Sequence, residues 1–102
     1  MRSGYRPLAI GADIADRLLE FAACALRFSS RLPRDAIDRH VALQWVRSAT
    51  SAGANYEEAR AAESRDDFAH KVSVAAKESR EAGYWTALVH RARWIGREVE
   101  PT

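Results

Sequence analysis

The sequence predicts an all-α protein: an antiparallel up-and-down helical bundle built as a single domain over residues 1–102. Two observations carry this prediction. Apolar residues recur at alternating spacings of three and four over three long stretches, which is the period of one face of an α-helix. Nowhere does the chain alternate apolar and polar residues as a half-buried strand would. Its 102 residues suit one helical core of moderate size.

The first helix is predicted to follow a flexible arm at residues 1–12, which holds two glycines and a proline. Asp13 is the expected N-cap, because its carboxylate can accept hydrogen bonds from the first free amides. Pro33 ends the helix. The predicted inward face consists of Ile14, Leu18, Phe21, Ala25, Phe28 and Leu32.

The second helix is expected from about Ala36 to Ala62, with Asp35 as its cap. Gly53 lies in its middle, where glycine costs about 1 kcal/mol relative to alanine. We therefore predict a tight crossing there, against the third helix or a neighbouring chain. The predicted inward face consists of Ala42, Val46, Ala49, Gly53 and Tyr56.

The third helix is predicted to begin after Ser64, because Ser64 and Asp67 have the spacing of a capping box. It should continue through Gly83 and end near Gly96, which leaves residues 97–102 as a charged tail. Its predicted inward face consists of Phe68, Val72, Ala75, Ser79 and Ala82, widened towards the end by Trp85, Leu88 and Val89.

Composition excludes several classes of protein. A net charge of +2 gives no strong attraction of the whole chain to nucleic acid or to a membrane. No run of about 18 apolar residues is present, so no membrane partner is expected and the predicted location is the cytoplasm. Cys24 is the single cysteine, which rules out an intrachain disulfide, and its apolar surroundings in the sequence predict an inert core thiol.

No enzyme signature is found, and we expect no catalytic residue, no metal and no cofactor. A metal site in a helical bundle uses Glu-x-x-His pairs, and none of the histidines has that spacing. The serines of the second helix lie in no nucleophile elbow, and Cys24 has no evident base.

Polar residues recur on the second and third helices where a plain amphipathic helix would be apolar. They form either a solvated face with serines bonded to their own helix, or a network between the two helices that fixes their register. In the second case Glu78 and Glu81 could face Arg47 and Ser51. The set comprises Arg47, Ser48, Ser51, Asn55, Glu58, Lys77, Glu78 and Glu81.

Charge is unevenly distributed between the two ends of the predicted bundle. The end of the first helix, the start of the second and the end of the third should lie together and collect arginines, whereas the opposite end collects carboxylates. Helix dipoles account for bases at helix C-termini but not at the start of the second helix. The surplus suits binding to phosphates. The predicted nucleic-acid contacts are Arg31, Arg34, Arg39, Arg91 and Arg93.

The central stretch carries a set of residues whose order, spacing and type agree with one family over roughly forty positions. They are Arg47, Ser48, Ser51, Gly53, Ala54, Asn55, Tyr56, Glu58, Ala59, Ser64, Asp67, Phe68, Lys71, Ala75, Lys77, Glu78, Glu81, Tyr84 and Trp85. In these residues the chain resembles the four-helix-bundle family of proteins encoded in intervening sequences of bacterial large-subunit ribosomal RNA genes. Accessory variability proteins of diversity-generating retroelements belong to the same group.

The resemblance implies antiparallel four-helix protomers that assemble into ring-like homopentamers without enzymatic activity. For the retroelement member it implies a basic surface that binds nucleic acid and a partner reverse transcriptase. The chain departs from the family after Trp94, where only eight residues follow and the fourth helix is truncated or missing. We therefore expect self-association to complete the bundle.

Two classes of function remain open from the sequence. One is a nucleic-acid-associated homo-oligomeric adaptor that binds RNA or DNA phosphates through its basic end. The other is a structural protein–protein interaction module without nucleic-acid binding.

Overall fold

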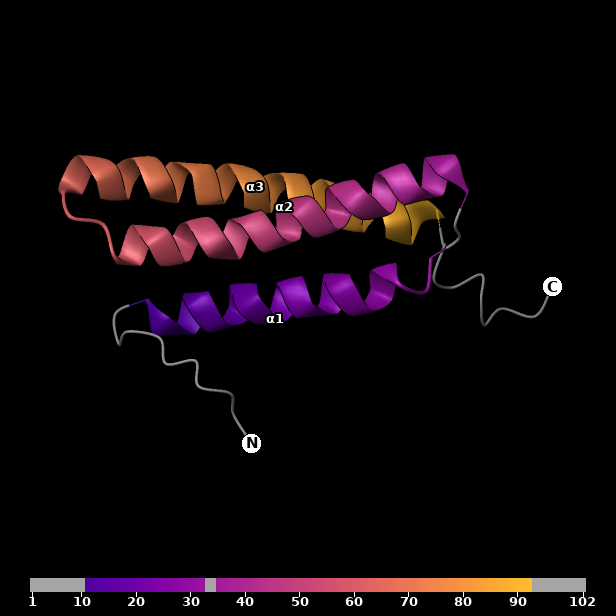
Figure 1. Ribbon diagram of the computed structural model, residues 1–102, viewed down its shortest axis with the longest axis horizontal. Coiled ribbons are helices and arrows are strands. Elements are labelled where there is room, and N and C mark those ends of the chain that lie inside the picture. The colour runs from indigo at the N-terminus through magenta and orange to yellow at the C-terminus, as the bar shows by residue number, and fades with distance from the viewer. Residues whose placement is uncertain (1–10, 33–34, 93–102) are drawn as a thin grey trace, which may run out of the picture.

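The computed structural model describes residues 11–32 and 35–92, and within them the chain forms three helices. They are α1 (Ala12–Ser29), α2 (Ala36–Arg60) and α3 (Arg65–Ala92). Successive helices run antiparallel, up, down and up (Figure 1). This arrangement confirms the predicted all-α bundle. Residues 1–10 of the predicted arm and the tail at 97–102 lie outside the described residues.

α2 is the central helix of the bundle. It packs along both α1 and α3, whereas α1 and α3 hardly touch each other (Figure 1). The largest apolar cluster lies towards the end where α1 finishes, α2 begins and α3 finishes. Its buried members are Ala25, Leu32, Val41, Trp45, Ala49, Ala82 and Val89, and Phe21, Phe28, Ala42, Trp85 and Leu88 pack against them.

The start of α1 differs from the prediction. Asp13 is not the N-cap; Gly11 is, with a φ of 78° in the left-handed region that glycine adopts most easily. A β-carbon on Gly11 would lie 2.6 Å from the hydroxyl oxygen of Tyr56, so a larger residue would have to displace that side chain and would also be strained by the positive φ. Asp13 lies in the first turn instead, with its carboxylate 3.3 Å from Nε of Arg17.

The caps of the other two helices confirm the predictions. The amide of Asp38 donates to Oδ1 of Asp35 at 2.8 Å, and the amide of Asp67 donates to Oγ of Ser64 at 3.1 Å. α2 ends at Arg60, two residues before the predicted end. α3 continues through Gly83 as expected, and its predicted end near Gly96 lies outside the described residues.

The inward face of α2 is rotated relative to the prediction. Of the five residues predicted there, only Ala49 is buried, because α2 contacts a helix on each side and its covered surface is wider than one seam. The buried residues of α2 are Val41, Trp45, Ser48, Ala49, Ala52 and Ala59.

Two further residues predicted to face inward are exposed. Ile14 and Phe68 are 49% and 48% accessible. Each lies near the start of its helix, at the end of the molecule opposite the apolar cluster. Because α1 and α3 barely contact each other, no third helix covers these side chains within the described part of the chain.

Gly53 does mark a helix contact, but its partner within the chain is α1 and not α3. A β-carbon at Gly53 would lie 3.6 Å from Cβ of Leu18 and 3.7 Å from its carbonyl carbon. These are ordinary van der Waals distances, so the crossing is close without being tight enough to demand glycine. The predicted contact with α3 is wrong because Gly53 lies on the side of α2 that faces α1.

Cys24 is not the core thiol that the sequence suggested. It is half-buried, and its sulfur lies 3.6 Å from Oε2 of Glu20 and 3.3 Å from Nη2 of Arg27. These three residues are spaced by four and three, so they share the polar outer face of α1. The apolar run around Cys24 extends beyond the buried face of α1, so the sequence pattern wrongly indicated a buried thiol.

Candidate nucleic-acid interface

The up–down–up order brings predicted phosphate-binding arginines to one end of the molecule. Arg31 lies two residues after the end of α1, Arg39 lies near the start of α2, and Arg91 lies in the last turn of α3. These three helix ends meet at the same end of the bundle (Figure 1), and all three side chains are exposed. Arg34 and Arg93, the other two predicted contacts, lie outside the described residues.

This end, which we call the basic end, carries Arg31, Arg39 and Arg91 together with acidic residues, and its positive charges outnumber the negative ones. The guanidinium of Arg31 lies 5.6 Å from the centre of the Phe28 ring, a cation–π distance that orients the side chain. Asp35 opposes the arginines, since the hydrogen bond from the Asp38 amide lowers the pKa of its carboxyl group and keeps it ionised. Arg39 lies at a helix N-terminus, where the helix dipole alone would favour an acid.

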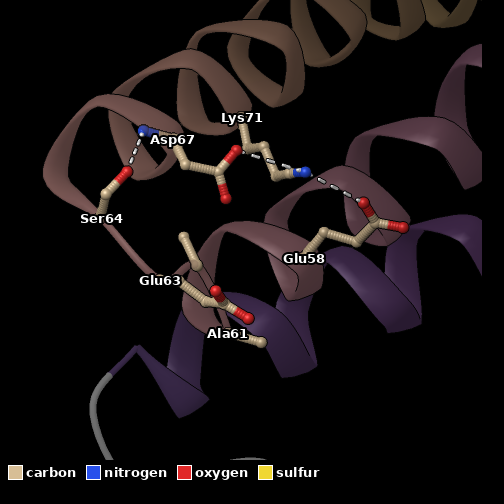
Figure 2. Close-up of a pocket in the computed structure, with 7 residues that line it drawn as sticks. Glu58, Ala61, Glu63, Ser64, Asp67 and Lys71 are labelled. Carbon is tan, nitrogen blue, oxygen red and sulfur yellow. Dashed lines mark hydrogen bonds and ion pairs between the residues drawn. The ribbon is translucent and has the colours of Figure 1, made fainter.

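The opposite end contains a hollow beside the turn between α2 and α3 (Figure 2). Lys71 lies 3.5 Å from both Glu58 and Asp67, and Glu63 adds a further carboxylate. This surplus of acids repels phosphate. The described residues contain no group of three or more His, Cys, Asp or Glu side chains arranged to hold a metal.

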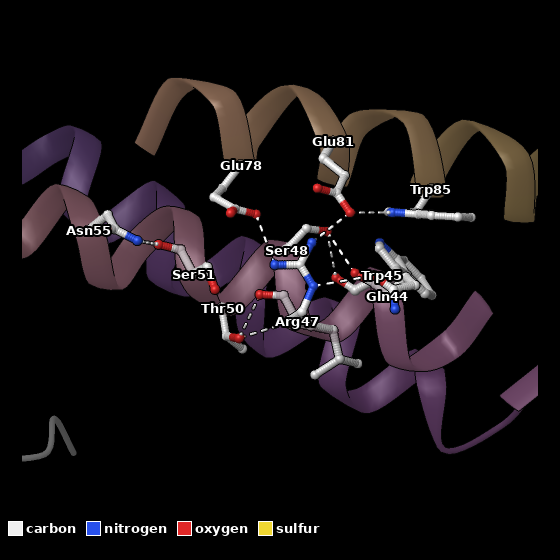
Figure 3. Close-up of polar contacts among 11 residues, drawn as sticks. Gln44, Trp45, Arg47, Ser48, Thr50, Ser51, Asn55, Glu78, Glu81 and Trp85 are labelled. Carbon is white, nitrogen blue, oxygen red and sulfur yellow. Dashed lines mark hydrogen bonds and ion pairs between the residues drawn. The ribbon is translucent and has the colours of Figure 1, made fainter. Parts of the chain in front are cut away.

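Part of the predicted polar set joins α2 to α3 (Figure 3). Nη2 of Arg47 lies 2.6 Å from Oε2 of Glu81, and Nη1 lies 3.3 Å from Oε1 of Glu78. The hydrogen bond from Arg47, followed by one of 3.1 Å from the indole nitrogen of Trp85, lowers the pKa of Glu81. The hypothesis of a network between the helices is therefore right for Arg47, Glu78 and Glu81.

Glu58 also reaches α3, through Lys71 at 3.5 Å, whereas Ser48 and Asn55 follow the other hypothesis. The hydroxyl of Ser48 donates to the carbonyl oxygen of Gln44 at 2.9 Å, and the amide of Asn55 donates to the carbonyl oxygen of Ser51 at the same distance. Both bonds stay within α2. These residues therefore satisfy their own polar groups on a helix that is packed on both sides.

Residues of the predicted family motif fall on two kinds of surface. Ser51, Asn55 and Tyr56 are half-buried on α2, whereas Lys77 and Tyr84 are exposed on α3. Packing against the neighbouring helices accounts for the half-buried residues. Burial does not explain the two exposed residues within the described part of the chain, although the Tyr84 ring contacts Trp85.

Sequence reasoning missed the contact between Trp45 and Thr86. Trp45 is only 4% exposed, and its indole nitrogen donates to Oγ1 of Thr86 at 2.9 Å. A buried tryptophan needs an acceptor, and Thr86 is a polar residue on the inward side of α3. Pairing Trp45 with Thr86 would have predicted the register of α2 against α3.

The fold and these contacts can be compared with known proteins. The family model described as 23S rRNA-intervening sequence protein matches residues 12–100. The chain belongs to this family. The match spans all three helices, so it confirms the resemblance seen in the motif residues of α2 and α3 and extends it to α1.

A solved structure supports the assignment to the 23S rRNA-intervening sequence protein family. It is the crystal structure of a protein of unknown function from the S23 ribosomal protein family of Bacteroides thetaiotaomicron. The two chains share 39% sequence identity with a TM-score of 0.73, over 83% of this chain and 79% of that chain. A comparison with curated proteins gave no match. Among the described residues, no helix is both long and apolar enough to cross a membrane.

Proposed function

We propose that this family member is a non-enzymatic, homo-oligomeric adaptor that binds the phosphates of RNA or DNA through its basic end. The observation that carries the proposal is the placement of Arg31, Arg39 and Arg91. They come from three different helices, and the topology brings them to one exposed end. The family name refers to an intervening sequence of 23S rRNA, which makes RNA the first nucleic acid to test.

The mode of binding follows from the kind of residue. Guanidinium groups donate several hydrogen bonds in a planar fork that matches phosphate oxygens. Contacts to phosphates position a nucleic acid without reading its sequence. We therefore expect affinity that depends little on sequence and falls steeply with salt, because each contact releases condensed counterions.

A pair of matched double variants tests the proposal. Arg31→Gln with Arg39→Gln removes two charges from the basic end, whereas Arg17→Gln with Arg65→Gln removes two exposed charges from the acidic end. The first variant should weaken binding to structured RNA several-fold in a gel-shift titration at low salt, and the second should bind like the parent. Helicity and mass should stay unchanged in both. Absence of binding by the parent, or equal binding by both variants, would overturn the proposal.

The second candidate function, a structural interaction module, is favoured by one specific observation. Leu19 and Leu26 are 48% and 59% exposed and lie seven residues apart, on one face of α1. Exposed leucines in line on a helix are typical of a surface that another chain covers. We propose that a second copy of the protein covers this face.

Light scattering at micromolar concentration tests the self-association. The parent should have the mass of an oligomer, and Leu19→Lys with Leu26→Lys should lower the mass while helicity is retained. A monomeric parent would contradict the proposal. An oligomeric parent that binds no nucleic acid would favour the structural module.

A further inference from the structure

The outer face of α3 carries an exposed row of cations with one aromatic residue between them. Lys77, Arg80, Tyr84 and Arg91 are spaced by three, four and seven residues, so they lie on one face of the helix. All four are exposed. At 1.5 Å per residue the row is about 21 Å long. We call these four residues the outer row of α3.

Tyr84 is held in place although it is exposed. It is 61% accessible, and its ring meets the edge of Trp85 with 5.1 Å between ring centres and an angle of 77°. Trp85 is itself fixed, because its indole nitrogen donates to Glu81, which Arg47 binds from α2 (Figure 3). The Tyr84 ring is therefore backed by a rigid partner while most of its surface faces solvent.

A shallow hollow lies next to this ring. Tyr84, Ala87, Leu88 and Arg91 line it. Tyr84 and Arg91 are two turns apart, about 10 Å along the helix, with the small Ala87 and the apolar Leu88 between them. A planar base adds about 3.4 Å to a stack, which is less than this spacing.

Two cations of the outer row, Arg80 and Arg91, are available for an anion, whereas Lys77 is close enough to Glu81 to help lower the pKa of that carboxyl group. Within the described part of the chain, neither Arg80 nor Arg91 forms an ion pair with a carboxylate. Glu81 adjoins the row, but its carboxylate is bound by Arg47 and Trp85. A row of cations around a single exposed aromatic ring fits a strand of phosphates and bases better than it fits an apolar protein surface.

We infer that Tyr84 stacks against an unpaired base of single-stranded RNA or DNA, while Lys77, Arg80 and Arg91 bind the phosphates on either side. The inference rests on the proposed function and names its substrate class. Bases within a duplex are stacked on each other and cannot reach the ring, so this site selects single-stranded segments. Because every base has an aromatic face, RNA and DNA strands should both use Tyr84.

The test compares three ligands of roughly 12 nucleotides, a length within the range that single-strand binding sites cover. They are a single strand, the same strand with abasic positions, and the duplex. Tyr84→Ala should weaken binding of the single strand about tenfold, which is the effect of one lost stack. It should leave duplex binding unchanged, and Tyr84→Phe should bind the single strand like the parent.

Phe68→Ala is the matched control, since Phe68 is another exposed aromatic residue of α3 but lies at the acidic end. It should bind all three ligands like the parent. Single strands of RNA and of DNA should show the same dependence on Tyr84. Circular dichroism should show equal helicity for all variants.

The inference is wrong if Tyr84→Ala binds the single strand like the parent, if it weakens the duplex equally, or if the abasic strand binds as well as the intact one. In each of these cases loss of binding in the Arg31 and Arg39 variant would still support the proposed function. If the parent binds none of the ligands at low salt, both the inference and the proposed function are wrong.

Discussion

α1 and α3 flank the same central helix but are held to it in different ways. α1 meets α2 through close apolar contact, as at Leu18 and Gly53. α3 shares the apolar cluster with α2 as well, but it adds directional polar bonds, from Trp45 to Thr86 and from Arg47 to Glu78 and Glu81. Apolar contact tolerates sliding and rotation, whereas hydrogen bonds and ion pairs specify a register.

The outer surfaces of the two helices differ in the same sense. α1 exposes leucines, which suit a second protein chain, and α3 exposes cations and an aromatic ring, which suit a nucleic acid. The polar bonds to α2 hold the nucleic-acid candidate surface in fixed geometry. The two surfaces therefore suggest separate tests, for self-association on α1 and for binding to the outer row on α3.

The largest effect on stability is expected at Trp45, which anchors α3 and lies within the apolar cluster. Trp45→Ala should lower the free energy of unfolding by about 3–5 kcal/mol in urea titrations, because it leaves a large cavity. Trp45→Phe keeps most of the volume and loses the bond to Thr86, so its effect should be clearly smaller. Equal effects for both variants would show that the cavity is not the main cost.

Overpacking should disrupt the contact between α1 and α2. Gly53→Leu should cost about 1–3 kcal/mol, because its side chain must displace Leu18. Gly53→Ala places its β-carbon at an ordinary 3.6 Å from Leu18 and removes a glycine from a helix interior, so it should be neutral or stabilising by up to about 1 kcal/mol. Thermal unfolding measures both. An alanine variant as unstable as the leucine variant would contradict this geometry.

A smaller, favourable effect is expected on the outer face of α3. A β-carbon at Gly83 would have nothing within 4 Å, and Gly83 lies inside the helix. Gly83→Ala should therefore raise the free energy of unfolding by about 0.5–1 kcal/mol through the lower backbone entropy of the unfolded chain. A lower melting temperature for this variant would show that Gly83 contacts something beyond the described residues.

The smallest effect is the pH dependence of the α2–α3 ion pairs. The pKa of Glu81 is lowered from its ordinary 4.5, so its contribution to stability is present above that pH and is lost as pH falls through the folded-state value. The parent should therefore lose stability in acid below about pH 4.5. Arg47→Met should flatten this slope, since it removes the largest cause of the lowered pKa.

The lowered pKa of Asp35 serves as an internal control, because its cause is the Asp38 amide and is the same in both proteins. The difference between parent and Arg47→Met thus isolates the ion pair. Parallel stability curves from neutral to acid pH would contradict the role assigned to Arg47.

Much of the fold could be predicted from the sequence because it depends on local rules. Helical period, the caps at Asp35 and Ser64, and the antiparallel order each follow from nearby residues. The inward face of α2 could not, because a helix packed on two sides has no single seam. The N-cap of α1 could not either, because Gly11 takes a left-handed φ beside the distant Tyr56, and no local pattern reveals that contact.

The candidate site was predicted in part. Topology alone places Arg31, Arg39 and Arg91 at one end, so a correct helix order is sufficient to group them. Arg80 was not predicted, because it lies along the middle of α3, away from the helix ends where the charges cluster. Whether Tyr84 is covered or exposed depends on packing between helices, which the sequence does not contain.

The central claim, that exposed arginines at the basic end bind phosphates, is tested most directly by the salt dependence of affinity. The logarithm of the association constant for duplex RNA should fall linearly with the logarithm of salt concentration. The slope for duplex DNA, about −0.9 per phosphate contact, serves as a guide to the expected size. Arg31→Gln with Arg39→Gln should make this slope shallower by the amount expected for the loss of about two phosphate contacts. Arg17→Gln with Arg65→Gln should leave the slope unchanged. A parent that fails to bind, or a slope that is the same in both double variants, would contradict the account.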